Sequence, residues 1–377
     1  MSLITYLTKI HFSVGIIDEA LPHELANLNI SNVLIVTDRG LVEAGLVERI
    51  CDVIPARISV SIYDGTPENP TESACSDAAH IFQQNQCDGI IALGGGSCID
   101  LAKAMAVLAT HDKPLSQYAA VEGGVTRIKD ILPPLIAIPT TAGTGSEVGR
   151  GAIIVFDDGR KLGLISPYLI PSVAICDPAL TLGLPAGLTA GTGMDALTHC
   201  VETYIATAYN PPADGIALDG LGRAAGNILA AVENGKNIEA RREMMAAAMN
   251  GALAFQKGLG GVHAISHALG GLAGYRLHHG TLNAILLPHI LAFNAPAVEP
   301  RYGALKHAMG LADNADLPNE IINLTKRIGL PTKLSEMGID DAAITKAAPL
   351  AERDHTNATN PRKATATDYA EIMRAAL

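Results

Sequence analysis

The first half of the chain alternates short apolar runs with stretches of helical periodicity. Residues 32–38, 89–93 and 135–139 form apolar runs rich in β-branched residues, which is typical of fully buried strands. Residues 58–63 form a further strand that is closed by a turn at residues 65–70. Residues 71–86 show a helical pattern that begins with Thr71 as a candidate N-cap. Because strands and helices alternate in this way, we predict a parallel sheet covered by helices on both faces.

The second half has a different character. No proline occurs between Pro212 and Pro288, and Ala, Leu, Met and Glu dominate this stretch, which is helical composition. We place the boundary near Leu184 and Pro185 and predict an α/β domain over residues 1–183. An all-α domain follows over residues 184–377.

Composition narrows the class of protein. The chain has 377 residues, a net charge of −11 and a charged fraction of 17%, so we expect no nucleic-acid partner. We expect no membrane span, because no run of eighteen apolar residues occurs. The six cysteines are scattered without a Cys-x-x-Cys motif, which predicts reduced thiols in a cytoplasmic protein. Lys9 and His11 interrupt the first apolar stretch, so we also expect no signal peptide.

A glycine-rich loop follows the buried run at residues 89–93. Gly94, Gly95, Gly96 and Ser97 lead from this run into a helical segment, and such a loop offers free backbone N–H groups to a phosphate. Ser97 and Asp100 have the spacing of a capping box, with Ser97 at the N-cap and Asp100 at N3. The alternative is a tight turn of an ordinary α/β protein, because the Gly-x-Gly-x-x-Gly pattern of the standard dinucleotide-binding domain does not occur.

Two further features lie at strand ends, where ligands bind to open parallel sheets. Asp38 closes the first run, where a carboxylate accepts from a ribose 2′-OH and repels a 2′-phosphate. Asp38 therefore favours NAD over NADP. The alternative interpretation is that Asp38 is an ordinary turn residue. The other feature is a polar loop whose hydroxyls are suited to the remaining cofactor groups, carried by Thr140, Thr141, Thr144 and Ser146.

Candidate metal ligands gather in the helical half. Asp195 and His199 stand four residues apart, so both side chains leave the same helix face. His263 and His267 repeat this spacing, and the run His278-His279-Gly280 follows. One carboxylate and several imidazoles suit a divalent transition metal, although such a pair alone is also an ordinary helix contact. We therefore predict that residues 1–183 bind the dinucleotide and that residues 184–377 bind the metal and the substrate. Because the glycine-rich loops and the candidate ligands lie in different halves, we expect a site between the two domains.

These motifs resemble those of the iron-containing (group III) alcohol dehydrogenases, whose fold is shared with dehydroquinate synthase. The likeness covers nearly the whole chain, and the order of the motifs makes it specific. It is carried by Val36-Thr37-Asp38, Gly94 to Ser97 with Asp100 and Lys103, Pro139 to Val148, Leu188 to His199, and Thr359-Asn360-Pro361-Arg362.

The resemblance implies roles for individual residues. It assigns the divalent metal, Fe²⁺ in preference to Zn²⁺, to Asp195, His199, His263 and His279. His267 matches a histidine near the nicotinamide that does not bind the metal, and we expect it to pass on the proton of the alcohol. A core histidine is the alternative. The implied cofactor contacts are the Gly94–Ser97 loop, Asp100, Thr140, Thr141, Thr144, Ser146 and Lys161. Phe255 lies in the stretch that usually lines the substrate pocket.

The sequence departs from the family pattern at three places. The spacing from His263 to His279 is about two residues longer than the family's, within residues 270–277, so His278 is a rival for the fourth ligand position. We prefer His279 because it directly precedes a glycine. Gly149 stands where threonine is commoner, and Thr356 where some members carry cysteine.

The predicted function is hydride transfer between NAD(H) and an alcohol, or its aldehyde or ketone. A metal-independent reductase of the maleylacetate reductase type and a dehydroquinate synthase-like lyase are the alternatives, and a non-catalytic nucleotide-binding protein leaves the histidines unexplained. Residues 4–14 have strand character, which predicts pairing between two copies in a homodimer or a larger homo-oligomer. The sequence does not name the alcohol.

Overall fold

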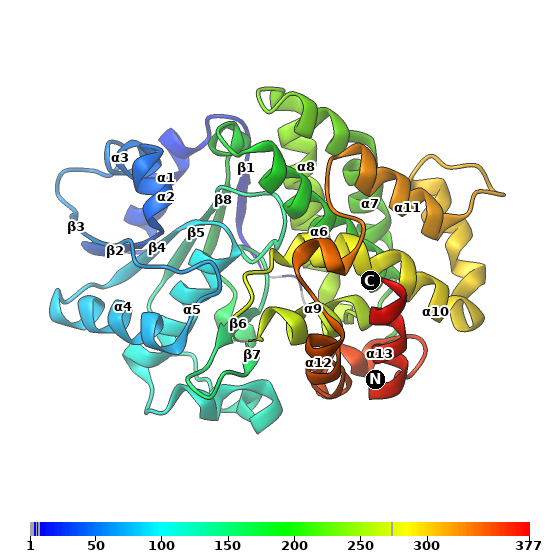
Figure 1. The fold of residues 1–377 in the computed structure, drawn as a ribbon. Helices are drawn as coiled ribbons and strands as arrows, with labels where there is room; N and C mark the ends of the chain where they lie inside the picture. Colours follow the sequence, from blue (N-terminus) through cyan, green and yellow to red (C-terminus); the bar gives the residue numbers. More distant parts are fainter. Residues whose placement is uncertain (1–3, 5, 7, 273) are drawn as a thin grey trace. The chain divides into compact units, whose positions relative to one another are not determined.

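The computed structural model describes residues 4, 6, 8–272 and 274–377, and the chain divides into two compact units. One unit holds residues 6–141 and Ser146–Gly183, and the other holds Ala142–Gly145 and Leu184–Leu377. We call them the sheet unit and the helical unit. Figure 1 shows their elements.

The sheet unit contains a six-stranded parallel sheet in the order β1-β8-β5-β4-β2-β3. The predicted strands at residues 32–38, 58–63, 89–93 and 135–139 are confirmed as β2, β3, β4 and β5, of which β3 is an edge strand with mostly exposed side chains. The strands are β1 (Ile10–Phe12), β2 (Asn32–Val36), β3 (Ser59–Tyr63), β4 (Gly89–Gly94), β5 (Leu135–Pro139) and β8 (Val173–Cys176), with a separate antiparallel pair, β6 (Gly151–Val155) and β7 (Lys161–Ile165).

Helices cover both faces of this sheet, as predicted. Leu34 and Ile90 point into one hydrophobic cluster with α4 and α5, whereas Val33 and Ile91 point into another with α1 and α3. Successive strand residues face opposite sides, and Figure 1 shows the two helix layers. The helices are α1 (Ile17–Asn27), α2 (Arg39–Glu43), α3 (Leu46–Cys51), α4 (Glu72–Gln84) and α5 (Gly96–Thr110).

The helical unit consists of packed helices, as the composition predicted. Its helices are α6 (Ala186–Ile205), α7 (Pro211–Glu233), α8 (Ile238–Ala254), α9 (Gly261–Gly270), α10 (His279–Ala308), α11 (Leu317–Arg327), α12 (Asp341–Arg353) and α13 (Ala366–Ala375). Short 3-10 helices join these elements, among them η6 (Phe255–Lys257) and η8 (His355–Thr359). By length and composition alone α10 is apolar enough to cross a membrane, but 61% of its apolar window is buried inside the protein.

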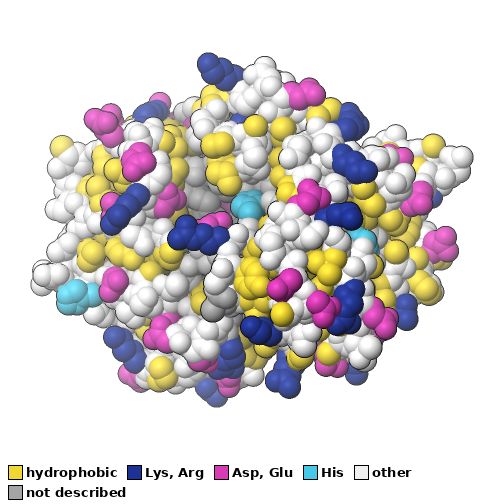
Figure 2. Space-filling model, viewed as in Figure 1, with side chains coloured by type: hydrophobic (Ala, Val, Ile, Leu, Met, Phe, Trp, Pro, Cys, Tyr) yellow, Lys and Arg dark blue, Asp and Glu magenta, His cyan; other side chains and the backbone are white. Residues whose placement is uncertain are grey.

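The surface and the cysteines agree with the composition. Figure 2 shows Lys and Arg side chains scattered among Asp and Glu on the described part of the face in view. All six cysteines are free thiols, and only Cys51 is more than slightly exposed.

Candidate metal centre

Helix α6 supplies the first two candidate ligands. Asp195 and His199 lie one helical turn apart, with exposed fractions of 3% and 5%. The helix can be buried on most of its surface because its sequence is rich in Gly, Ala and Thr. The two residues therefore face the interior of the helical unit.

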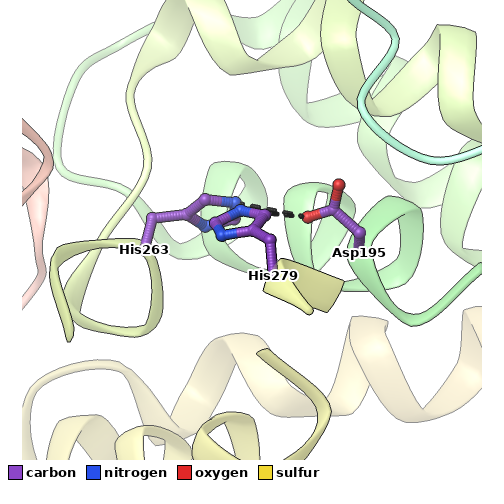
Figure 3. Close-up of side chains that lie close together, drawn as sticks. All are labelled: Asp195, His263 and His279. Atoms are coloured by element: carbon purple, nitrogen blue, oxygen red, sulfur yellow. Dashed lines mark ion pairs between the residues drawn. The ribbon is translucent and has the colours of Figure 1, made fainter. Parts of the chain in front are cut away.

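Helices α9 and α10 bring in two more histidines. Asp195 Oδ1 lies 3.6 Å from the Nε2 atoms of both His263 and His279, and 3.7 Å from Nε2 of His199. Figure 3 shows His263 and His279 pointing at the Asp195 carboxylate. One carboxylate oxygen is thus the meeting point of three imidazoles from three helices.

This donor set fits a divalent transition metal. Bonds of about 2.1 Å in a tetrahedral site place neighbouring ligand atoms about 3.4 Å apart, close to the observed separations. The ligand atoms of Asp195, His263 and His279 all lie within 4.8 Å of one another. His199 does not belong to this group of three, and its ring is stacked on that of His263 at 4.6 Å.

The charges of the site also suit a cation. Burial alone would raise the pKa of Asp195, but the neighbouring histidines outweigh it and the pKa is lowered, so the carboxylate stays ionised. Burial lowers the pKa of His199 to about 4, which keeps this imidazole neutral. Burial disfavours charge on His263 too, but Asp195 and Glu202 prevail and raise its pKa to about 9. Binding a metal at His263 therefore requires the loss of a proton.

The structure separates the two rival histidines. His278 is the N-cap of α10, and its Nδ1 accepts from the backbone N–H of Thr281. His279, the first residue of the helix, reaches Asp195 instead. A Cβ on Gly280 would lie 2.0 Å from the carbonyl oxygen of Gly191. A glycine must therefore follow His279 for the start of α10 to approach α6 this closely.

Glu202 is a buried residue of the site that the sequence reasoning missed. It lies on α6, one turn beyond His199, and is 1% exposed. His263 Nδ1 donates to Glu202 Oε2 at 2.6 Å, and the backbone N–H of Val262 donates to Oε1 at 2.7 Å. Such a carboxylate fixes the tautomer of a metal-binding histidine and leaves Nε2 for the metal. The spacing of three residues from His199 was the available signal.

Asn283 was missed as well. It stands one turn after His279 on α10, is fully buried, and donates from Nδ2 to Asp195 Oδ1 at 2.8 Å. Its Oδ1 is buried without a hydrogen-bond partner. Leaving such a group unpaired costs on the order of 1–3 kcal/mol.

His267 lies beside two of the candidate ligands, His263 and His279. Its ring stacks on that of His279 at 5.5 Å, and its Nδ1 hydrogen-bonds Asp354 Oδ2 at 3.0 Å. Thr356 donates to the other oxygen of Asp354 from its N–H and its hydroxyl. Ligand atoms of His267, Asp354 and His355 also lie within 4.8 Å of one another, but both Asp354 oxygens are already engaged. Phe255 packs its ring edge against His199 at 5.3 Å.

The glycine-rich loop of the sheet unit differs from the prediction in one respect. The capping box of Ser97 and Asp100 is wrong: α5 begins at Gly96, its N-cap is Gly95, and no side chain caps it. Ser97 donates to the carbonyl of Glu68, and Asp100 accepts from the N–H of Ile153. The first N–H groups of α5 therefore remain available to a phosphate. Gly94 has φ 150°, and a Cβ there would lie 2.5 Å from Cys98 Sγ.

The other predicted cofactor residues lie in both units. Asp38 caps α2 by accepting from the N–H of Leu41 at 3.0 Å. Lys103 is 1% exposed and donates to Ser146 and to the carbonyls of Gly149 and Gly151, which fixes the polar loop. Thr140 and Thr141 belong to the sheet unit and Thr144 to the helical unit. Lys161, on β7, donates to Asn69 at 2.8 Å.

Comparison with known proteins identifies the family. Residues 8–178 match the sequence model described as iron-containing alcohol dehydrogenase, and residues 189–377 match that of the Fe-containing alcohol dehydrogenase family, C-terminal. The chain therefore belongs to the iron-containing alcohol dehydrogenase family, a class of oxidoreductases, as its motifs predicted.

Individual relatives extend this comparison. A 4-hydroxybutyrate dehydrogenase of Cupriavidus necator is 51% identical over 380 residues, which cover 99% of each chain. The crystal structure of a 1,3-propanediol oxidoreductase is 35% identical and covers 100% of both chains with a TM-score of 0.94. Sulfoacetaldehyde reductase from Bifidobacterium kashiwanohense, solved in complex with NAD+, is 27% identical over 100% of this chain and 99% of its own, with a TM-score of 0.89.

Proposed function

We propose that this enzyme transfers a hydride between a primary alcohol and NAD at a divalent metal held by Asp195, His199, His263 and His279. The observation that carries the proposal is the convergence of three Nε2 atoms on Asp195 Oδ1 at 3.6–3.7 Å. When bound, the cation supplies Lewis acidity that lowers the pKa of the alcohol hydroxyl. The family's name favours Fe²⁺, and Zn²⁺ suits the same donors.

His267 is proposed to accept the proton of the alcohol. Asp354 holds Nδ1 of His267 at 3.0 Å, and this supports a tautomer in which Nε2 is the accepting atom. Asp354 stays ionised because His267 and His355 outweigh the effect of burial and lower its pKa. Asp354 is then a positioning residue, and the proton leaves from His267.

Residues 1–183 are proposed to bind the dinucleotide and residues 184–377 the metal and substrate. The assignment of dinucleotide binding is supported by the N-terminus of α5, which follows the glycine-rich loop and has no side-chain cap. Asp38 is proposed to accept from the adenosine ribose and so to favour NAD. Thr140, Thr141, Thr144 and Lys161 are assigned to the remaining cofactor contacts. Asp100 and Ser146 are assigned to holding the polar loop in place.

The substrate is proposed to be a short hydroxy acid such as 4-hydroxybutyrate, because the relative that is 51% identical is named for it. Arg276 stands three residues before His279, is exposed, and has no hydrogen-bond or ion-pair partner among the described residues. We assign it to the carboxylate of the substrate. Arg276→Gln should raise KM for 4-hydroxybutyrate by about tenfold and leave KM for 1,4-butanediol, which lacks the carboxylate, unchanged. Equal effects on the two substrates would contradict the assignment.

The enzyme is further proposed to be a cytoplasmic homodimer. β1 (Ile10–Phe12) is an edge strand of the six-stranded sheet, and an edge can pair with its copy across a two-fold axis. The rest of the predicted strand includes residues 5 and 7, which lie outside the described residues. Light scattering at micromolar concentration should give at least twice the chain mass, and a monomer would rule out this assembly.

An assay of the purified enzyme tests the proposed reaction. NADH should form on addition of the hydroxy acid and NAD, cease after treatment with a chelator, and return with Fe²⁺ under anaerobic conditions. Turnover that survives complete removal of the metal would refute the proposed role of the four ligands.

A further inference from the structure

Asn283 touches three of the four candidate ligands. Its Nδ2 lies 2.8 Å from Asp195 Oδ1, 3.4 Å from His263 Nε2 and 3.3 Å from His279 Nε2. Because α10 places Asn283 one turn after His279, the carboxamide is aimed at the same point as the ligand atoms. The side chain is fully buried, so its position is set by the protein rather than by solvent.

The other end of the carboxamide is unsatisfied. Asn283 Oδ1 is buried and accepts no hydrogen bond. A buried amide that pairs only its NH₂ group, and pairs it with the atoms that would bind a cation, calls for an explanation. In a site without an ion, the carboxylate oxygen Oδ1 of Asp195 is a hydrogen-bond acceptor and attracts the NH₂ group. With a cation among the ligand atoms, an NH₂ group would present its positive end to the ion.

Building on the metal centre of the proposed function, we propose that Asn283 is a further protein group of that centre, which turns Oδ1 toward the ion when the ion is bound. The two ends of a carboxamide have nearly the same shape, so half a turn about the Cβ–Cγ bond exchanges them without moving other atoms. One end lacks a hydrogen bond in either orientation. The presence or absence of an ion among Asp195, His263 and His279 therefore decides whether Oδ1 or the NH₂ group of Asn283 faces them.

A fifth group of this kind affects the choice of metal. A carboxamide oxygen is a harder donor than imidazole, and oxygen donors favour ions such as Mn²⁺ over Zn²⁺ relative to an all-nitrogen set. Asn283 should therefore reduce the selectivity for Zn²⁺ over Mn²⁺ that imidazole ligands confer. Removing its oxygen should weaken the binding of Mn²⁺ more than the binding of Zn²⁺.

Competition with a chelator measures the dissociation constants for Zn²⁺ and Mn²⁺ directly. Asn283→Ala and Asn283→Leu should weaken both by about 10–100-fold, as is typical of groups that support metal ligands, with the larger loss for Mn²⁺. Asn283→Asp keeps an oxygen in the same place and adds a charge, so it should bind both ions at least as tightly as the wild type. Melting temperatures of the metal-free variants show whether each is folded.

Asn294→Ala is the matched control. Asn294 is a fully buried asparagine on the same helix, but it hydrogen-bonds to Asn360. Asn294→Ala should therefore have a lower melting temperature and unchanged dissociation constants for both metals. If Asn283→Ala and Asn283→Leu bind metal as tightly as the wild type or more tightly, the proposal is overturned while the metal centre stands. If the wild type itself binds neither ion, both fail.

Discussion

Replacing Glu202 by glutamine should disable the metal centre without removing a ligand. In the wild type, His263 Nδ1 donates to one carboxylate oxygen of Glu202 at 2.6 Å, and the N–H of Val262 donates to the other at 2.7 Å. A glutamine has one oxygen for these two donors. If its NH₂ group faces Nδ1, the proton of the imidazole moves to Nε2, and a donor then points at Asp195 where the metal requires a lone pair.

The magnitude follows from these contacts. Loss of a carboxylate behind a metal-binding histidine typically weakens metal affinity 10–100-fold, or about 1.4–2.7 kcal/mol. The buried hydrogen bonds to the charged group contribute about 1.5–3 kcal/mol each to the folded protein. Glu202→Gln should therefore bind Zn²⁺ at least ten times more weakly and, without metal, melt at a lower temperature.

The assay is chelator competition, with Glu24→Gln as the control. Glu24 is also 1% exposed and also pairs with a histidine, His11, at 2.8 Å, but in the sheet unit. The control should lose stability and keep its metal affinity. If Glu202→Gln binds Zn²⁺ within about twofold of the wild type, the tautomer argument is refuted.

Four further predictions concern protonation and cofactor choice. Because the pKa of His263 is raised to about 9 from its ordinary value of 6.5, metal affinity should rise about tenfold per pH unit from pH 7 to 9; a flat profile would contradict this. The same raised pKa stabilises the metal-free protein below pH 6.5, and denaturant titrations should show that contribution disappearing as the pH rises through 9. Asp38→Gly should narrow the preference for NAD over NADP, and equal kcat/KM for the two cofactors in the wild type would exclude Asp38 as their discriminator. His267→Ala should keep its metal and lose mainly kcat together with one limb of the pH–rate profile, whereas a stable, metal-replete and fully active variant would exclude the proton-accepting role.

Local sequence was enough for features that depend on neighbouring residues. Thr71 was predicted to cap a helix, and its hydroxyl accepts from the N–H of Ala74, three residues on. The buried strands were predictable because strands covered on both faces read as continuous apolar runs. The pair Asp195 and His199 could also be recognised from the sequence, because both residues lie on one turn of one helix.

Features that depend on distant partners were not predictable in this way. The capping box at Ser97 and Asp100 failed because Asp100 bonds Ser146 and Ile153, about fifty residues away. Glu202 and Asn283 were missed because their partners, His263 and Asp195, lie on other helices. A sequence motif identifies the candidate ligands, but only the packing of α6, α9 and α10 shows which buried polar side chains hydrogen-bond to these ligands.

Metal content after anaerobic purification, measured side by side for the wild type, His279→Ala and His278→Ala, shows which histidine of α10 binds the metal. His279 Nε2 faces Asp195, whereas His278 caps α10. One divalent ion per chain is expected in the wild type and in His278→Ala, and loss of the ion together with activity is expected in His279→Ala. A stoichiometric ion retained by His279→Ala and lost from His278→Ala would refute the assignment of His279 as a metal ligand.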